Sequence, residues 1–278
     1  MSATRDLTGP LPDPSPLVRG RLGTGREALW RVPEEVPVAF LLNGESFAVM
    51  MATPADLEEF ALGFALTEGI VAAPDEISRL AIAEAAEGFV VNLAVDPAQA
   101  ARVAARKRSF AGRAGCGICG AQTVAAALPR PPQVRGPRPT AAALASAFDA
   151  LAATQAMNAE NRSTHAAAFC DASGGILVTR EDIGRHNALD KLGGALARSR
   201  RAAREGFVLL SSRISVEMVQ KAAMLGAPFL AALSAPSALA LRVAARAGMG
   251  LAARAGGDVM VFAPETWETS GISGVPAA

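Results

Sequence analysis

Two apolar runs of strand length open the ordered part of the chain. Residues 36–42 and 47–51 are separated by a short polar segment that begins with Asn43-Gly44. Because Asn-Gly readily adopts the positive φ angles of a tight turn, this pattern predicts a β-hairpin. A further apolar run over residues 89–95 predicts another strand.

Between the apolar runs 47–51 and 89–95, the apolar residues follow helical spacing instead. Apolar side chains recur three and four positions apart over residues 56–65, and Gly69 can end the helix. Thr53 and Pro54 are typical N-cap and first-turn residues, so we expect the helix to begin there. Residues 97–108 predict a second, basic helix.

From residue 140 onward, strand and helix patterns alternate. Thr140 is expected to cap an alanine-rich helix, and each apolar strand that follows is succeeded by a turn and usually by a helix. Such alternation is typical of a layered α/β domain. The predicted strands cover 165–171, 176–180, 207–211, 228–233, 249–253 and 259–262, and the predicted helices cover 140–157, 186–198, 215–225 and 236–247.

The pattern therefore predicts an α/β protein made of an α+β N-terminal unit and an α/β C-terminal domain. Residues 1–32 hold several prolines without periodicity and are expected to be a flexible tail. We expect the α+β unit over 33–128 and the C-terminal domain over 140–278. Residues 129–139 contain five prolines in eleven positions and predict a linker between them.

Composition narrows the possible partners. The 278 residues include 27 basic and 26 acidic ones, so a general nucleic-acid coat is not indicated. No apolar run reaches membrane-spanning length, and prolines interrupt the start of the chain where a signal peptide would be apolar. We expect a cytoplasmic protein with neither a nucleic acid nor a membrane as partner.

Two of the three cysteines, Cys116 and Cys119, lie in Gly-Cys-Gly-Ile-Cys-Gly, residues 115–120. Glycine disfavours helix and strand interiors, so this segment predicts a mobile, thiol-bearing loop. No Asp or Glu occurs between Pro97 and Phe148. A positive field lowers the pKa of a thiol and attracts anions. The cations of this window are Arg102, Arg106, Lys107, Arg108, Arg113, Arg130, Arg135 and Arg138.

Three kinds of site are compatible with a Cys-x-x-Cys pair. A zinc site needs about four ligands, and Cys170, His165 and His186 are the only other cysteine and histidines in the chain. A thioredoxin-type site would follow a strand and open a helix. A sulfur carrier needs an exposed thiolate that can hold a persulfide and move between donor and recipient. We expect no metal site.

A dense polar segment, residues 181–191, follows one of the predicted C-terminal strands. Asp182 or Asn187 could simply cap the next helix. That explanation does not account for Arg185 and His186, which stand where open α/β sheets bind ligands.

Similar segments follow two other strands. Arg213 ends a Ser-Ser-Arg sequence suited to phosphate, and residues 234–237 repeat the strand-to-helix turn. His165 begins the first strand of the domain and is compatible with either a buried core histidine or a ligand contact.

Together with the Cys-Gly-Ile-Cys-Gly loop, these segments resemble the FdhD/NarQ family of formate dehydrogenase accessory sulfur carriers. The resemblance extends over nearly all residues after about position 32. It also includes Asn43-Gly44, Thr53-Pro54-Ala55-Asp56-Leu57, Gly63-Phe64 and Thr67-Glu68-Gly69.

The resemblance implies a sulfurtransferase-like carrier that accepts sulfur from a cysteine desulfurase and serves the formate dehydrogenase catalytic subunit. The recipient would be that enzyme's molybdenum bis(molybdopterin guanine dinucleotide) cofactor, or its tungsten counterpart. Cys116 would carry the persulfide, with Cys119 as its partner. The resemblance further implies a homodimer and a three-layer C-terminal domain similar to the cytidine deaminase fold.

We also expect this chain to bind the guanine-nucleotide arms of the cofactor. His186 is the expected catalytic residue of the pocket. Two departures occur: Arg162-Ser163 stands where the family has a glycine, and an aromatic residue is missing near 253–258. The expected cofactor-binding residues are Ala253, Arg254, Ala255, Gly256, Gly257, Asp258, Arg213, Arg185 and His165.

Two alternatives belong to other functional classes. A zinc-dependent deaminase needs His-x-Glu and Pro-Cys-x-x-Cys. Here Ala167 stands two positions after His165 and no proline precedes Cys116, so this alternative fits poorly. A chaperone could instead deliver the nucleotide cofactor without handling sulfur, and replacing both loop cysteines by serine would separate it from a carrier.

Overall fold

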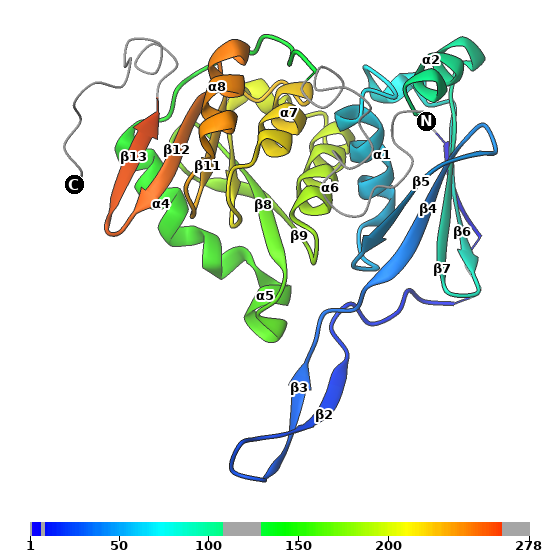
Figure 1. Ribbon diagram of the computed structural model, residues 1–278, viewed down its shortest axis with the longest axis horizontal. Helices are drawn as coiled ribbons and strands as arrows, with labels where there is room; N and C mark the ends of the chain where they lie inside the picture. Colours follow the sequence, from blue (N-terminus) through cyan, green and yellow to red (C-terminus); the bar gives the residue numbers. More distant parts are fainter. Residues whose placement is uncertain (1, 7–8, 108–128, 263–278) are drawn as a thin grey trace.

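A computed structural model describes residues 2–6, 9–107 and 129–262 of the chain. Two main β-sheets stand on either side of a central pair of helices (Figure 1). These helices, α1 (Leu57–Thr67) and α6 (Arg185–Arg198), pack side by side between the sheets. The predicted α/β fold is confirmed.

The N-terminal sheet has five strands in the order β1-β6-β7-β4-β5. Strand alternation turns Val38, Phe40 and Leu42 toward α1, and the ring of Phe40 stacks on that of Phe64 with centroids 4.2 Å apart. The predicted hairpin over 36–51 is present. The elements are β1 (Ser2–Asp6), β4 (Val36–Leu42), β5 (Glu45–Ala52), the 3-10 turn Pro74–Glu76, β6 (Arg79–Ala85), β7 (Gly88–Ala94) and α2 (Pro97–Lys107).

The expectation of a flexible tail over residues 1–32 is wrong where the structure contains strands. Strand β1 pairs in parallel with β6 at the edge of the sheet. Strands β2 (Leu17–Arg21) and β3 (Glu27–Arg31) form a separate hairpin that projects from the body of the molecule (Figure 1). These strands are short and mostly solvent-exposed, so burial leaves no periodic pattern in their sequence.

The C-terminal sheet has six strands in the order β13-β12-β11-β10-β8-β9. Its three central strands, β10, β11 and β12, run parallel, and the outer pairs are antiparallel. The strands are β8 (His165–Cys170), β9 (Ile176–Asp182), β10 (Phe207–Leu210), β11 (Phe229–Ala232), β12 (Gly250–Ala255) and β13 (Asp258–Phe262).

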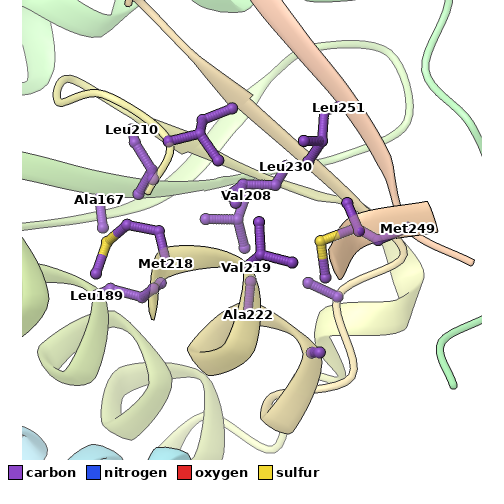
Figure 2. Close-up of a cluster of buried hydrophobic side chains, with 14 of the residues drawn as sticks. Ala167, Leu189, Val208, Leu210, Met218, Val219, Ala222, Leu230, Met249 and Leu251 are labelled. Atoms are coloured by element: carbon purple, nitrogen blue, oxygen red, sulfur yellow. The ribbon is translucent and has the colours of Figure 1, made fainter. Parts of the chain in front are cut away.

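Helices cover both faces of this sheet, which makes the domain three-layered. On one face, α6, α7 (Val216–Met224) and α8 (Ala238–Ala247) enclose the cluster in Figure 2, where Met218 and Val219 pack against Val208 and Leu230 of the central strands. On the other face, α4 (Ala141–Leu151) packs onto Phe207 and Phe229.

The helix expected over 140–157 is interrupted. Thr140 caps α4 as predicted, since its side chain accepts a hydrogen bond from the Ala143 amide at 3.1 Å. The chain then forms a 3-10 turn, Ala152–Thr154, and a short helix, α5 (Ala156–Asn161). Another short 3-10 turn, Ala203–Glu205, leads into β10.

The expected start of α1 at Thr53 and Pro54 is wrong. The helix begins at Leu57, after Asp56, whose φ is 54° and whose side chain makes no capping bond. Thr53 instead bonds across to the C-terminal domain: its hydroxyl accepts a hydrogen bond from the Ile183 amide at 3.1 Å. A long-range partner thus replaces the local cap.

Glycines allow α1 and α6 to approach closely. A Cβ atom on Gly63 would lie 1.6 Å from the Asp190 carbonyl oxygen, and one on Gly194 would lie 1.9 Å from that of Glu59. Both obstacles are backbone atoms, so only glycine fits at either position. This contact fixes the N-terminal unit against the C-terminal domain.

The proline-rich stretch 129–139 contains neither helix nor strand. It lies against the C-terminal domain, where the Val134 amide donates to the Ala247 carbonyl at 2.9 Å and the Val134 side chain is buried. None of the helices in the described ranges is long and apolar enough to cross a membrane.

Candidate functional site

Several strands of the six-stranded sheet begin or end along one side of it, across the strand direction. We call this line of strand ends the edge of the C-terminal sheet. Leu210, the last residue of β10, is level with Ala232 at the end of β11, and His165 at the start of β8 is level with Asp182 at the end of β9. The turns after β10 and β11 touch, because the Ser237 amide donates to the Ile214 carbonyl at 3.0 Å. The strand-end segments singled out in the sequence therefore share this edge.

His186 lies in the first turn of α6 at this edge and is 8% exposed. Within the described part of the chain, its buried Nε2 atom has no hydrogen-bond partner. Burial lowers the pKa of His186 to about 3, aided by the positive charges of Lys221 and Arg185 and opposed by Glu68. The imidazole is therefore neutral at neutral pH and acts as a hydrogen-bonding group rather than as a cation.

Other polar atoms on α6, on α7 and just before α7 are also buried and unpaired. Among the described residues these are Arg185 Nε, Ser215 Oγ and Gln220 Nε2. Unpaired buried polar groups are uncommon in native proteins and are costly unless a ligand or water satisfies them. Arg213 follows β10, lies two residues before Ser215 and is solvent-exposed.

His165 is half-buried at the start of β8. Burial lowers its pKa, with a further contribution from the Arg185 guanidinium, while Asp182 opposes the shift. Arg185 thus acts on both histidines, and the structure brings these three predicted site residues together.

Lys221 on α7 lies at the centre of an ionic cluster that sequence reasoning missed. Its ammonium contacts both carboxylate oxygens of Asp190 at 2.9 Å, Glu68 at 2.9 Å and the Thr67 hydroxyl at 3.0 Å. Thr67 in turn donates to Asp190 at 2.6 Å. We call Lys221, Asp190, Thr67 and Glu68 the Lys221 cluster; it joins α1, α6 and α7.

Asp190 and Lys221 are both charged at neutral pH. Burial raises the pKa of Asp190 to about 6, although Lys221 and Thr67 partly oppose this. Burial alone lowers the pKa of Lys221, but Asp190 and Glu68 outweigh it and the pKa is raised. A helical pattern could have revealed this lysine, since Lys221 shares the buried face of α7 with Met218 and Ala222.

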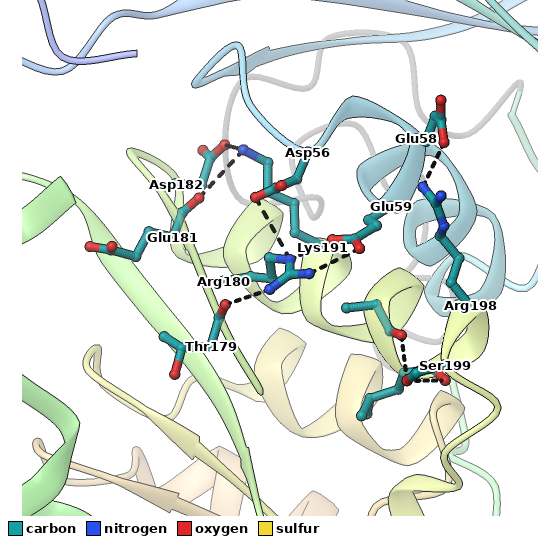
Figure 3. Close-up of polar contacts among 12 residues, drawn as sticks. Asp56, Glu58, Glu59, Thr179, Arg180, Glu181, Asp182, Lys191, Arg198 and Ser199 are labelled. Atoms are coloured by element: carbon teal, nitrogen blue, oxygen red, sulfur yellow. Dashed lines mark hydrogen bonds and ion pairs between the residues drawn. The ribbon is translucent and has the colours of Figure 1, made fainter. Parts of the chain in front are cut away.

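Lys191 is the centre of a second ionic cluster. Its ammonium lies 2.7 Å from Asp182, as Figure 3 shows. It also lies 3.0 Å from the Thr53 carbonyl oxygen. Asn187 donates to Asp182 at 3.0 Å and to the Met51 carbonyl at 2.7 Å. We call Lys191, Asp182, Thr53 and Asn187 the Lys191 cluster. Figure 3 also shows the nearby Arg180–Glu59 and Arg198–Glu58 ion pairs, which connect the same two units.

The polar segment 181–191 therefore serves two purposes. Asp182 accepts a hydrogen bond from the Gly184 amide at 2.7 Å, and Glu181 accepts from the Met157 and Asn158 amides at 2.8 Å, so these acids organise backbone. Arg185 and His186, by contrast, retain unpaired atoms.

The segment Ala253–Asp258 lies at the same sheet edge but is divided between faces. Ala253 is buried, whereas Arg254 pairs with Asp149 of α4 at 2.7 Å. Arg254 therefore faces the opposite side of the sheet from His186, as strand alternation requires. The remaining residues of the segment, Ala255, Gly256, Gly257 and Asp258, are exposed in the β12–β13 turn.

Cys116 and Cys119 lie outside the described residues, between α2 and the stretch 129–139. Cys170 is fully buried in β8, and burial raises its pKa to about 12. In the described ranges, no group of three or more His, Cys, Asp or Glu side chains could hold a metal ion.

Two surface pockets lie away from His186. One, of about 440 Å³, is lined by residues 11–14 and the start of α1. The other, of about 320 Å³, lies at the far ends of α6 and α7 and includes Arg135, Arg201 and Arg204.

Comparison with known proteins shows which family the chain resembles. Residues 33–265 match the FdhD/NarQ family. A protein of Xanthomonas campestris pv. campestris (strain B100) named sulfur carrier protein FdhD is 49% identical over 203 residues, which cover 73% of this chain and 72% of the relative. A protein of Agrobacterium fabrum with the same name is 46% identical over 219 residues, covering 78% and 80%.

A solved structure extends the likeness to the fold. The crystal structure of a formate dehydrogenase accessory protein from Desulfotalea psychrophila superposes with a TM-score of 0.69 at 25% identity, covering 91% of this chain and 97% of that one. Sequence and fold agree across both the N-terminal unit and the C-terminal domain, and the chain belongs to the FdhD/NarQ family.

Proposed function

We propose that the protein is a sulfur carrier required for formate dehydrogenase activity. It accepts sulfur from a cysteine desulfurase as a persulfide on Cys116 and passes it to the molybdenum (or tungsten) bis-guanylyl-pterin cofactor before insertion into the catalytic subunit. The observation that carries the proposal is the similarity to proteins named sulfur carriers, at 46–49% identity over more than two thirds of the chain.

Loading of sulfur on Cys116 is a thiolate exchange. The Cys116 thiolate attacks the outer sulfur of the desulfurase persulfide, a new S–S bond forms on Cys116, and the desulfurase thiolate leaves. The outer sulfur atom is transferred from the desulfurase to Cys116 without net oxidation or reduction. The arginine-rich, acid-free sequence around Cys116 favours both the attacking thiolate and the anionic product.

Cys119 provides a route for release. Its thiolate attacks the inner sulfur of the Cys116 persulfide, a Cys116–Cys119 disulfide forms, and the outer sulfur leaves as hydrosulfide. The two cysteines supply the electrons that reduce the sulfur, so a dithiol reductant must restore them before the next cycle.

The cofactor's phosphates and guanine bind at the sheet edge in this proposal. The neutral imidazole of His186, the Arg185 guanidinium and the exposed Arg213 supply hydrogen-bond donors and positive charge beside unpaired buried atoms. His165 and the 253–258 turn flank the same edge. We also propose that two copies of the chain form a homodimer.

Intact mass spectrometry after incubation with a cysteine desulfurase and cysteine tests the proposal. We expect a mass gain of one sulfur in the wild type, no gain in Cys116→Ser, and loading with weakened delivery in Cys119→Ser. The matched control is Cys170→Ala, which removes the buried thiol. If Cys116→Ser gains sulfur as the wild type does, the proposal is wrong.

The same variants distinguish a carrier from a delivery chaperone. A chaperone that only holds the nucleotide cofactor would still mature formate dehydrogenase when Cys116 and Cys119 are both serine. We expect that double variant to lose maturation while it retains affinity for guanosine diphosphate.

A further inference from the structure

His186 and the Lys221 cluster lie next to each other on α6. Asp190 follows His186 by four residues, which places both on the same face of the helix. Lys221 reaches that face from α7 and contacts both Asp190 oxygens at 2.9 Å. The unpaired imidazole thus lies one helical turn from the carboxylate that holds this buried cation.

The position of this cation is set by contacts from two other helices, α1 and α6. Thr67 and Glu68 at the end of α1 contact Lys221 at 3.0 and 2.9 Å, and Asp190 contacts it from α6. The aromatic ring of Phe64 lies 5.6 Å from the ammonium. A long lysine side chain held by four groups has little freedom, so its charge stays at one place.

Burying the Lys221–Asp190 ion pair costs desolvation free energy. The side chain of Lys221 is 10% exposed and that of Asp190 is fully buried, and buried ion pairs often contribute little to stability or oppose it. Replacing such a pair by well-packed apolar residues is often neutral or stabilising. What distinguishes this pair from the fully buried Lys191–Asp182 pair is the unpaired Nε2 atom of His186, one helical turn from Asp190.

We propose that Lys221 is a positioning residue for His186: anchored by Asp190, Thr67 and Glu68, it holds a positive charge against the face of α6 that carries the imidazole and leaves the Nε2 atom available to ligand. The inference rests on the proposed function, in that the ligand is the anionic sulfur or phosphate chemistry brought to this edge. An anion bound beside Lys221 and Arg185 would offset their charges, so the imidazole could take up a proton only once the anion has arrived.

The charged and titratable groups facing His186 come from four elements. Lys221 on α7, Arg185 on α6 and His165 on β8 favour the neutral ring, whereas Glu68 at the end of α1 favours the protonated one. Removing the Lys221 charge is therefore expected to raise the pKa of His186, and removing the Glu68 charge to lower it.

NMR of the imidazole nitrogens tests the proposal directly, because the chain has only two histidines. His165→Asn assigns the signals. In the wild type we expect the His186 nitrogens to remain those of a neutral ring from pH 8 to about 4.5. In Lys221→Met the onset of protonation should move upward by about one pH unit.

Two further variants separate charge from structure. Lys221→Arg retains the charge and should keep the wild-type profile. Lys191→Met removes another buried lysine, on α6 itself, whose partner is Asp182, and it should leave the His186 profile unchanged. If Lys221→Met fails to fold, the pair Lys221→Met with Asp190→Asn removes both charges and preserves the shape of the site.

An upward shift in the Lys221→Met variants alone supports the proposal. No shift in either of them, or an equal shift in Lys191→Met, overturns it. The experiment needs no sulfur donor, so its outcome is independent of whether Cys116 carries sulfur. A normal sulfur gain in Cys116→Ser would overturn the proposed function while leaving this titration result in place.

Discussion

The two buried lysine clusters are built from the same parts but differ in how completely they are satisfied. Each pairs a lysine with an aspartate and a threonine of the N-terminal unit, and each has members on α6. In the Lys191 cluster, lysine and aspartate are both fully buried. In the Lys221 cluster, Lys221 is 10% exposed, Glu68 is 28% exposed, and unpaired atoms of Arg185 and His186 lie close by in α6.

This difference separates a structural charge from a functional one. The Lys191 cluster connects the strand-to-helix segment around Thr53 to the start of α6, with every carboxylate oxygen of Asp182 bonded. Its contacts within the described ranges thus satisfy the Asp182 carboxylate without a ligand. The Lys221 cluster places a buried positive charge near Arg185 and His186, which still have unpaired atoms. Such an arrangement is expected of a site that binds a ligand.

Asp182→Asn should produce the largest loss of stability. Among the described residues Asp182 is the acid paired with the fully buried Lys191 ammonium, and breaking a buried pair in this way typically costs about 3–5 kcal/mol. Asp190→Asn should cost less, because Lys221 keeps Glu68 and reaches solvent. Urea unfolding of both variants measures the free energies; equal losses would contradict the distinction between the clusters.

Gly63→Ala should have the next largest effect. The new methyl group would meet the Asp190 carbonyl oxygen, and overpacking of this kind costs about 1–3 kcal/mol. Because the obstacle is backbone, α1 and α6 must separate, which strains both clusters. Gly23→Ala is the matched control, since no atom lies within 4 Å of its Cβ position. Comparable melting temperatures for the two variants would show that the close helix contact is not needed.

Periodic burial explains which parts of the fold were predictable. The strands and helices of the C-terminal domain have strong apolar patterns, and their order follows the prediction with small shifts at the ends. The β2–β3 hairpin and the start of α1 were not predictable from local pattern. The hairpin buries little, and Thr53 is held by Ile183 and Asp182, about 130 positions further along the chain.

The site was predictable in part for the same reason. Arg185, His186 and Arg213 follow strands, and parallel strand ends share an edge in any open α/β sheet. The Lys221 cluster required knowledge of which helices touch, because Thr67, Asp190 and Lys221 belong to three separate elements. The Arg254–Asp149 pair likewise appears only once the faces of the sheet are assigned.

Arg213→Ala should leave stability almost unchanged and lower ligand affinity. Arg213 is exposed, and surface substitutions usually change the free energy of unfolding by less than about 0.5 kcal/mol. A charge-assisted hydrogen bond to phosphate contributes about 1.5–3 kcal/mol, so calorimetry with guanosine diphosphate should show affinity reduced by about tenfold or more. Arg242→Ala, an exposed arginine on α8, is the control and should bind as the wild type does. Unchanged affinity in Arg213→Ala would remove this arginine from the site and leave the Arg185–His186 pair as its cationic and polar centre.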